Sequence, residues 1–282
     1  MINILFSGNS RVFDGILTCC LSILKRTKTT KSFNFIIFTM DVSHLNPNYT
    51  AINDELVMYL DKIVKTYNQL NQVTKIDVTK LYNQEFAGCL NEGAYCSPYT
   101  LLRLLADLIE MPDKLLYLDV DLMFNRDIEL LWNQNLEGYE YAAAKDHYGK
   151  KLVHPRYINA GVLLLNMKEI KQTQLFVKAR QLLRERKLMF ADQSAIIRST
   201  TKRKLLSQRF NDQKYLHKKT VVRHFSKRLF WLPYPHTANV KQWHVADVHR
   251  IFKYYQFDDI YEEYNYYKLK YQLEIKENFK NE

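Results

Sequence analysis

Glycine is scarce in this sequence, with seven among 282 residues. The seven are spaced so that they form neither a GxGxxG turn nor the GxxxxGK of a P-loop. Both motifs use glycine to let backbone amide groups approach phosphates closely. Their absence argues against a nucleotide-cofactor oxidoreductase, which would otherwise be an alternative for an α/β protein.

Cysteine and long apolar runs are also rare. The four cysteines form no CxxC pair and no His-rich cluster for zinc, and so low a count fits a reducing compartment. The N-terminal MINILFSGNS becomes polar too soon for the apolar core of a signal peptide. No apolar run approaches the roughly 18 residues that a membrane span needs. These absences predict a cytoplasmic protein. The cysteines are Cys19, Cys20, Cys89 and Cys96.

Negative charge is in deficit, because 41 Lys and Arg residues outnumber 30 Asp and Glu residues and give a net charge of +11. Such a surplus predicts attraction to polyanions, whether nucleic acid, anionic lipid or phosphorylated small molecules. One alternative is therefore a non-enzymatic nucleic-acid-binding protein, since basic grooves with aromatic side chains bind single strands. The basic residues are spread along amphipathic helices, however, and no motif of a known nucleic-acid module occurs. We expect no nucleic-acid partner.

Apolar residues alternate between strand-like and helix-like spacing along the first third of the chain. INILF at 2–6 and FNFIIFT at 33–39 are continuous apolar runs typical of buried strands. Helix-like spacing follows each of them, over 13–24 and then 51–70. This rhythm predicts an α/β fold with a mixed, mostly parallel sheet flanked by helices.

Further elements are expected downstream. SPYTLLRLLADLI predicts a helix in which Ser97 is the N-cap and Pro98 lies in the first turn. The other expected elements are strands at 115–118, 141–144 and 160–165 and one long basic helix at 168–186.

The C-terminal end has a composition of its own, with seven tyrosines between residues 254 and 271. No linker rich in Gly, Pro or Ser separates it from the rest, so we predict one principal domain, 1–250, and a helical extension, 251–282. Two roles for the extension stay open. Its tyrosines could pack on the principal domain, or its tyrosines and lysines could contact an anionic membrane surface.

The run LLYLDVDLMF, 115–124, leads from a predicted buried strand directly into two carboxylates, Asp119 and Asp121. Side chains two residues apart on a strand point the same way, so this pair could bind one ion. Hard oxygen ligands suit Mg²⁺ or Mn²⁺, and open α/β sheets bind ligands at the carboxyl ends of their strands. By itself the pair could equally cap helices or bind surplus lysines.

Six segments, taken in order, carry a resemblance to a known family. They are ILFSGNSRVFDG, SPYTLLRLL, LLYLDVDLMF, YINAGVLLLNM, FADQSAI and VVRHFS, and they span roughly the first 230 residues. In this order and spacing they resemble glycosyltransferase family 8. The resemblance implies a GT-A fold, a nucleotide-sugar donor and a reaction that retains the anomeric configuration.

The resemblance also implies roles for individual residues. Asp119 and Asp121 match the DxD motif that binds the metal, and His224 matches the histidine that completes the site, which suits Mn²⁺ or Mg²⁺. Asp192 and Gln193 match a DQ pair at the reacting sugar and are our catalytic candidates. The remaining positions matched to the donor site are Ser7, Asn9, Arg103, Val120, Asn159, Ala160 and Lys227.

Several of these matches have a plainer structural alternative. Arg103 could form a structural salt bridge or hold the aspartates in place. His224 could be a buried strand histidine bonded to a backbone carbonyl. Asp192 could be the N-cap of the helix QSAIIRS, and Asn159 could belong to a tight turn before the strand GVLLL.

The sequence departs from the family pattern at two places. Asn9 stands where the family has an acidic residue that bonds uracil, and Val12 or Phe13 would replace the aromatic platform beneath the base. An asparagine oxygen can still accept from the uracil N–H. The family's HxxGxxKPW-like run after the metal histidine is not reproduced in HFSKRLFW. Lys227 or Arg228 could then supply positive charge to the diphosphate, and we assign that role to Lys227.

Together these implications predict a metal-dependent retaining hexosyltransferase. It would move galactose or glucose from UDP-galactose or UDP-glucose to an acceptor hydroxyl of a cell-surface glycan, glycolipid or glycoprotein. Because Gln193 is a poor nucleophile and no carboxylate is clearly placed as one, we expect front-face attack through a short-lived oxocarbenium-like state. The expected location is the cytoplasm, or the inner face of the cell membrane as a peripheral protein.

Overall fold

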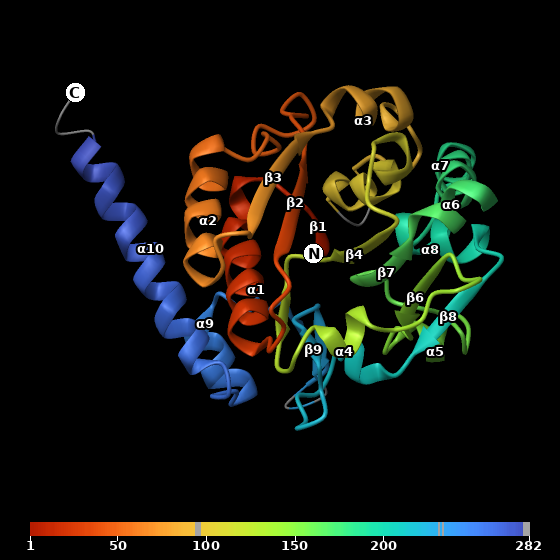
Figure 1. The fold of residues 1–282 in the computed structure, drawn as a ribbon. Helices are drawn as coiled ribbons and strands as arrows, with labels where there is room; N and C mark the ends of the chain where they lie inside the picture. Colours follow the sequence, from red (N-terminus) through yellow and green to blue (C-terminus); the bar gives the residue numbers. More distant parts are fainter. Residues whose placement is uncertain (94–96, 231, 233, 279–282) are drawn as a thin grey trace.

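A seven-stranded sheet forms the centre of the protein (Figure 1). The computed structural model describes residues 1–93, 97–230, 232 and 234–278, so Cys96 lies outside it. The strands are β1 (Ile2–Ser7), β2 (Phe33–Thr39), β3 (Gln72–Asp77), β4 (Lys114–Leu118), β6 (Tyr141–Ala144), β7 (Val162–Asn166) and β8 (Arg203–Leu206). Their order is β3-β2-β1-β4-β7-β6-β8.

The direction of the strands changes in the middle of this sheet. β1 to β4 are mutually parallel, β7 runs antiparallel to both β4 and β6, and β8 runs parallel to β6. This is the mixed, mostly parallel sheet that the sequence predicts. The reversal brings the carboxyl end of β4 against the start of β7, where the candidate site lies.

Helices cover both faces of the sheet, and each face has its own apolar core. Helices α1 (Phe13–Arg26) and α2 (Asp54–Tyr67) cover one face, and η2 (Pro98–Leu108), α7 (Leu175–Glu185) and α8 (Ala191–Ser199) cover the other. Successive residues of β4 therefore enter opposite cores: Leu116 and Leu118 the first, Leu115 and Tyr117 the second.

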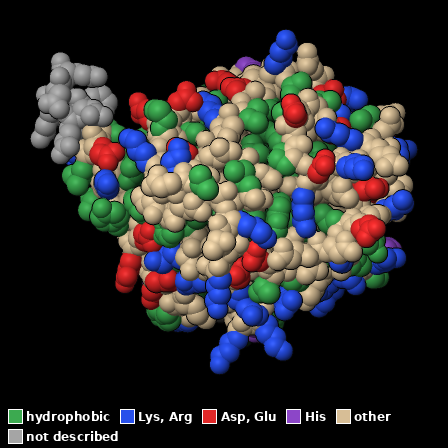
Figure 2. Space-filling model, in the orientation of Figure 1, with side chains coloured by type: hydrophobic (Ala, Val, Ile, Leu, Met, Phe, Trp, Pro, Cys, Tyr) green, Lys and Arg blue, Asp and Glu red, His purple; other side chains and the backbone are tan. Residues whose placement is uncertain are grey.

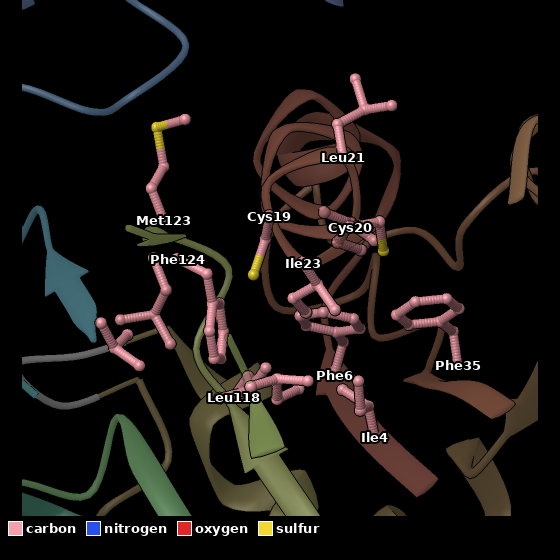
Figure 3. Close-up of a cluster of buried hydrophobic side chains, with 14 of the residues drawn as sticks. Ile4, Phe6, Cys19, Cys20, Leu21, Ile23, Phe35, Leu118, Met123 and Phe124 are labelled. Carbon is pink, nitrogen blue, oxygen red and sulfur yellow. The ribbon is translucent and has the colours of Figure 1, made fainter. Parts of the chain in front are cut away.

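The first core joins β1 and β4 to α1. Figure 3 shows Phe6 and Leu118 from the sheet lying against Cys19 and Ile23 of α1. All four side chains are fully buried. Burying one large apolar side chain contributes about 1.5–3 kcal/mol, so this packing fixes α1 over the strands that carry the site.

Short elements connect these layers. They are η1 (Ser10–Val12), α3 (Thr79–Phe86), β5 (Leu122–Phe124), α4 (Glu129–Trp132), α5 (Gly149–Leu152), α6 (Met167–Thr173), η3 (Gln208–Phe210), β9 (Val222–His224), β10 (Arg228–Phe230), β11 (His236–Ala238), α9 (Val245–Asp247) and η4 (Val248–Phe252). β5 pairs with β9, and β10 pairs with β11, as two small antiparallel sheets.

Two predicted helices differ from the expectation. The helix predicted over 168–186 is broken into α6 and α7 at Gln174, which has a left-handed backbone with φ of 57°. The Gln174 N–H donates to carbonyl groups in the last turn of α6, which ends there. The amphipathic pattern of the sequence continues across this helix end, which is why it predicted a single helix. η2 is a 3₁₀-helix with Pro98 in its first turn, but Ser97 makes no side-chain capping bond.

The C-terminal helix α10 (Asp258–Asn278) lies along α1 and α2 and extends beyond them (Figure 1). Tyr261 and Tyr264 are buried, as the packing alternative predicted. Arg26 binds Asp259 at 2.7 Å, and the Tyr59 hydroxyl donates to the Tyr267 carbonyl at 2.7 Å. The first half of α10 is therefore attached to the domain by both apolar packing and ion pairs.

Positive charge is spread over the face of the protein that Figure 2 shows. Figure 2 shows Lys and Arg side chains scattered over one face among Asp and Glu rather than gathered in a single groove. A scattered pattern of this kind is typical of a solvated surface. Among the helices of the described residues, none combines the length and apolar character needed to cross a bilayer.

Glu140 fixes the segment that follows α8. Its side chain is fully buried, and its carboxylate accepts hydrogen bonds from the N–H groups of Thr201 at 3.1 Å and Lys202 at 3.2 Å. Burial alone would raise the pKa of Glu140, but hydrogen bonds from Thr200 and its neighbours hold the pKa below its ordinary value of 4.5. Glu140 thus fixes the C-terminal end of α8, the helix whose first turn carries Asp192 and Gln193.

We predict that Glu140→Gln lowers the free energy of unfolding at neutral pH by about 1.5–3 kcal/mol, as for other hydrogen bonds to a charged group. Because the folded-state pKa is lowered, the contribution is complete well above 4.5 and is lost as the pH falls through the folded-state value. Denaturant unfolding of both proteins across this range measures it, with the exposed Glu137→Gln as control. A difference that grows towards acid pH would contradict the assignment.

Candidate functional site

The turn after β4 brings the predicted metal ligands together. The Asp119 N–H donates to the Gly161 carbonyl at 2.8 Å, which ties the turn to the start of β7. Pairing of β5 with β9 brings His224 beside Asp121, with Nε2 3.0 Å from Oδ1. One ligand atom from each of Asp119, Asp121 and His224 lies within 4.8 Å of the others.

The His224 ring is held by side chains rather than by a backbone carbonyl. Buried Asn211 donates from Nδ2 to Asn159 Oδ1 at 2.8 Å, so its own Oδ1 faces His224 Nδ1 at 3.0 Å. Nδ1 then carries the ring hydrogen, and the Nε2 lone pair faces Asp121. A lone pair and a carboxylate at 3.0 Å repel each other unless a proton or a metal cation accompanies them. The donor set therefore fits a divalent cation.

Gly161 leaves open the space that such a cation would use. A Cβ atom at this position would lie 2.5 Å from His224 Cε1 and 2.7 Å from Asp119 Oδ2, closer than real Cβ atoms approach. Glycine is thus required by close approach. The Gly161 N–H donates to Asn159 Oδ1 at 3.0 Å, which agrees with the tight-turn alternative for Asn159.

Arg103 is buried between Asp119, which follows β4, and Asp192, which lies in α8. Its Nη2 donates to Asp119 Oδ1 at 2.9 Å, and its Nε lies 3.2 Å from Asp192 Oδ2. It also donates to the carbonyl groups of Thr100 at 3.0 Å and Ala160 at 2.5 Å. The guanidinium is only 2 % exposed, so its charge is balanced mainly by these partners. Arg103 therefore holds the aspartates in place through a structural ion pair.

Asp192 and Gln193 lie in the first turn of α8. The N-cap of this helix is Phe190, so the alternative that Asp192 is the N-cap is wrong. Burial raises the pKa of Asp192, and the nearby Arg103 opposes that rise only in part. Gln193 Oε1 accepts the Ala160 N–H at 2.9 Å, which orients its carboxamide.

Lys241 is the residue that the sequence-based assignment missed. Its Nζ lies 2.5 Å from Asp121 Oδ2. Burial alone would raise the pKa of Asp121, but Lys241 and His224 hold it well below its usual range. Gln242 donates to the Val120 carbonyl at 2.7 Å, which fixes this segment against the DxD turn.

A signal for Lys241 was present in the sequence. KQW at 241–243 keeps the Lys and Trp spacing of the HxxGxxKPW-like run, but the hairpin of β10 and β11 separates it from His224. Lys227, to which the role was assigned, also borders the site. The structure thus offers two lysines, of which Lys241 contacts a predicted metal ligand.

Two cavities meet at Asp119, and every predicted site residue lines at least one of them. The β1 cavity has a volume of about 680 Å³, and the α8 cavity has a volume of about 720 Å³. Lys227 borders both. The β1 cavity is lined by residues that include Ser7, Asn9, Val12, Val120, Lys241 and Trp243. The α8 cavity is lined by residues that include Asn159, Ala160, Asp192, Gln193, Leu152 and Met189.

The β1 cavity is lined by both polar and aromatic side chains. The Ser7 hydroxyl is buried and finds no hydrogen-bond partner among the described residues. Both amide atoms of Asn9 are already bonded to backbone groups. Of the two platform candidates, Val12 lines the cavity and Phe13 is buried in the first core. Trp243 supplies an aromatic ring at this cavity that the sequence did not suggest.

The chain is similar to known proteins in both sequence and structure. The sequence profile described as Glycosyl transferase family 8 matches residues 3–245. A Haemophilus influenzae protein, provisionally named a glycosyltransferase, is 29 % identical over 189 residues, covering 63 % of this chain and 52 % of its own length. The chain thus spans about half the length of this curated relative.

Solved structures share the fold at low sequence identity. The galactosyltransferase LgtC, in complex with donor and acceptor sugar analogs, is 19 % identical, with a TM-score of 0.57 over 79 % of this chain and 86 % of that one. The glycosyltransferase GlyE of Streptococcus pneumoniae is also 19 % identical, with a TM-score of 0.57 over 86 % of this chain and 61 % of that one. The resemblance found in the sequence motifs is confirmed: the chain has the GT-A fold, and it belongs to glycosyl transferase family 8.

Proposed function

We propose that this glycosyltransferase transfers galactose or glucose from a UDP-sugar to an acceptor hydroxyl, with retention of configuration and with a divalent cation. The observation that carries the proposal is the cluster of Asp119, Asp121 and His224 at the junction of two cavities. A diphosphate placed at this junction would have the nucleoside on one side and the sugar on the other.

The two cavities differ in ways that suit these two parts of a donor. The β1 cavity has the unpartnered Ser7 hydroxyl and the Trp243 ring, which suit a ribose and a base. The α8 cavity has Asn159, Asp192 and Gln193, whose oxygen and nitrogen atoms suit sugar hydroxyls. We therefore assign UDP to the β1 cavity and the sugar to the α8 cavity.

Charge at the junction would stabilise the departing UDP. A divalent cation on Asp119, Asp121 and His224, Mn²⁺ or Mg²⁺, supplies Lewis-acid stabilisation of the diphosphate. Lys241 adds a positive charge next to Asp121, and Lys227 borders the same space. As the bond from C1 to the diphosphate oxygen breaks and the acceptor oxygen bonds C1, the acceptor proton would pass to that diphosphate oxygen.

Retention is proposed to follow from attack on the face that UDP leaves. The carboxylate of Asp192 is 3.2 Å from Arg103 Nε, and this ion pair supports a role in binding sugar hydroxyls rather than in nucleophilic attack. The Gln193 carboxamide accepts a hydrogen bond from the Ala160 N–H, and a carboxamide is a poor nucleophile. A covalent glycosyl-enzyme on Asp192, detected by mass spectrometry during turnover, would overturn this mechanism.

The rim of the α8 cavity is apolar. Leu152 is 81 % exposed and Met189 is 75 % exposed, and both line this cavity. Exposed apolar side chains next to a binding site favour a ligand that has an apolar part. Among surface glycans, glycolipids and glycoproteins as acceptors, this rim favours a glycolipid.

The outward side of α10 supports peripheral contact with an anionic membrane. Tyr266, Leu269 and Leu273 are all more than half exposed and lie three to four residues apart, so they share one helix face with Lys270 between them. Exposed aromatic and apolar side chains next to a lysine suit a membrane interface. We therefore propose that the enzyme works at the inner face of the cell membrane.

The metal proposal predicts the behaviour of Asp121→Asn. Because several kcal/mol of leaving-group stabilisation are removed, UDP release from UDP-galactose or UDP-glucose in the presence of Mn²⁺ should fall by at least about a hundredfold. A coupled assay for UDP, run with and without Mn²⁺, measures this. Asp113→Asn, at the opposite end of β4, is the control and should keep full activity. Equal activity of Asp121→Asn and wild type would reject the proposal.

The same assay can compare how much Lys241 and Lys227 each contribute to kcat. Lys241→Met should lower kcat by about a hundredfold, the usual loss when one group that stabilises a developing charge is removed. Lys227→Met should have a smaller effect, because no contact with a metal ligand is found for Lys227 among the described residues. A greater loss in Lys227→Met would restore the sequence-based assignment and remove Lys241 from the proposed role.

Membrane contact can be tested without disturbing the core. Truncation of α10 would remove the buried Tyr261 and Tyr264, so we choose Leu269→Ser combined with Leu273→Ser instead. Sedimentation with vesicles containing phosphatidylserine should show wild type bound and the double variant mostly free, with equal UDP release in solution. Wild type that stays in the supernatant would end the membrane proposal.

A further inference from the structure

Tyr117 lies beside the metal cluster without belonging to it. It is the residue two places before Asp119, at the end of β4, and it is 1 % exposed. Side chains two residues apart on a strand point to the same face of the sheet, so the Tyr117 ring and the Asp119 carboxylate lie on the same face. Its hydroxyl donates to Asp119 Oδ1 at 2.9 Å.

The two oxygens of Asp119 have different surroundings. Oδ1 accepts two hydrogen bonds, from the Tyr117 hydroxyl at 2.9 Å and from Arg103 Nη2 at 2.9 Å. Oδ2 faces the open space at Gly161, where a Cβ atom would lie 2.7 Å away, and His224 borders the same space. Two donors on one oxygen set the rotation of the carboxylate and direct the other oxygen to the cluster.

The aromatic ring of Tyr117 also orients Arg103. The guanidinium carbon lies 4.0 Å from the ring centroid, a favourable cation–π arrangement for a buried cation. Tyr117 therefore contacts Asp119 directly through its hydroxyl and again indirectly through the arginine that it supports. Removing the hydroxyl would break the first contact and leave the second.

We propose that Tyr117 is a positioning residue of the metal site, which holds the Asp119 carboxylate so that Oδ2 faces the cation. This inference rests on the proposed function, because it assumes that Asp119, Asp121 and His224 bind a divalent ion. Groups that orient a metal ligand typically contribute 10- to 100-fold to metal affinity. The competing explanation is that a buried phenol simply bonds the nearest acceptor and contributes only to folding.

The experiment compares two buried tyrosines that each bond a carboxylate. Tyr82 is fully buried, and its hydroxyl donates to Glu92 at 3.2 Å, away from the cluster. Titration of the purified enzyme with Mn²⁺ alone, followed by the electron paramagnetic resonance signal of free Mn²⁺, gives the metal Kd. We expect Tyr117→Phe to raise this Kd about tenfold. Tyr82→Phe should leave it within experimental error of wild type.

A third variant keeps the test valid if Tyr117→Phe folds poorly. Tyr117→p-aminophenylalanine, introduced by codon suppression, retains a donor at the same place and should restore the wild-type Kd. Unfolding of all three variants without metal shows what each change does to stability alone. A role confined to folding would lower stability and leave the Kd unchanged.

Failure of this inference can be told from failure of the proposed function. Wild-type enzyme that binds no Mn²⁺ would reject the metal site itself. Wild type that binds Mn²⁺, with Tyr117→Phe binding it equally well, would overturn only the role of Tyr117. Weak binding by the p-aminophenylalanine variant, with its fold intact, would also contradict that role.

Discussion

Two carboxylates at the edge of an apolar core need compensating positive charge, and the site is built around that need. Asp121 is 8 % exposed, so water stabilises its charge poorly. Lys241 and His224 lie on its two oxygens, while Arg103 lies between Asp119 and Asp192. The charges of Lys241 and Arg103 already offset part of this negative charge. A divalent ion and the diphosphate of a donor would complete the balance between protein and substrate.

The fold brings these groups together from distant parts of the chain. The reversal of strand direction between β4 and β7 places the DxD turn against Gly161, and the absence of a side chain there leaves room between Asp119 and His224. β9 and the segment around Lys241 then close the other side. Because each contributor is anchored by a sheet or a buried hydrogen bond, the ligands are held before a substrate binds.

Sequence patterns predicted the parts of this structure that depend on local signals. The continuous apolar runs gave β1 and β2 correctly, whereas β3 was missed because QVTKID, an exposed edge strand, is largely polar. The amphipathic pattern could not show the break at Gln174, since the buried apolar residues of α6 and α7 belong to the same apolar core. The predicted site residues all line the two cavities. Lys241 was missed because a hairpin separates it from His224. Asn211 was missed because its contacts with Asn159 and His224 join residues far apart in the sequence. Tyr117 was missed because a tyrosine in a buried strand gives no sign of what its hydroxyl bonds.

The cation between protein and diphosphate can be located directly. Crystals grown with UDP and Mn²⁺ would be measured on both sides of the manganese absorption edge, and the anomalous difference map would be calculated. We expect one strong peak in contact with Asp119, Asp121 and His224 and with the diphosphate oxygens. UDP bound at the junction of the two cavities with no manganese beside these three residues would contradict it.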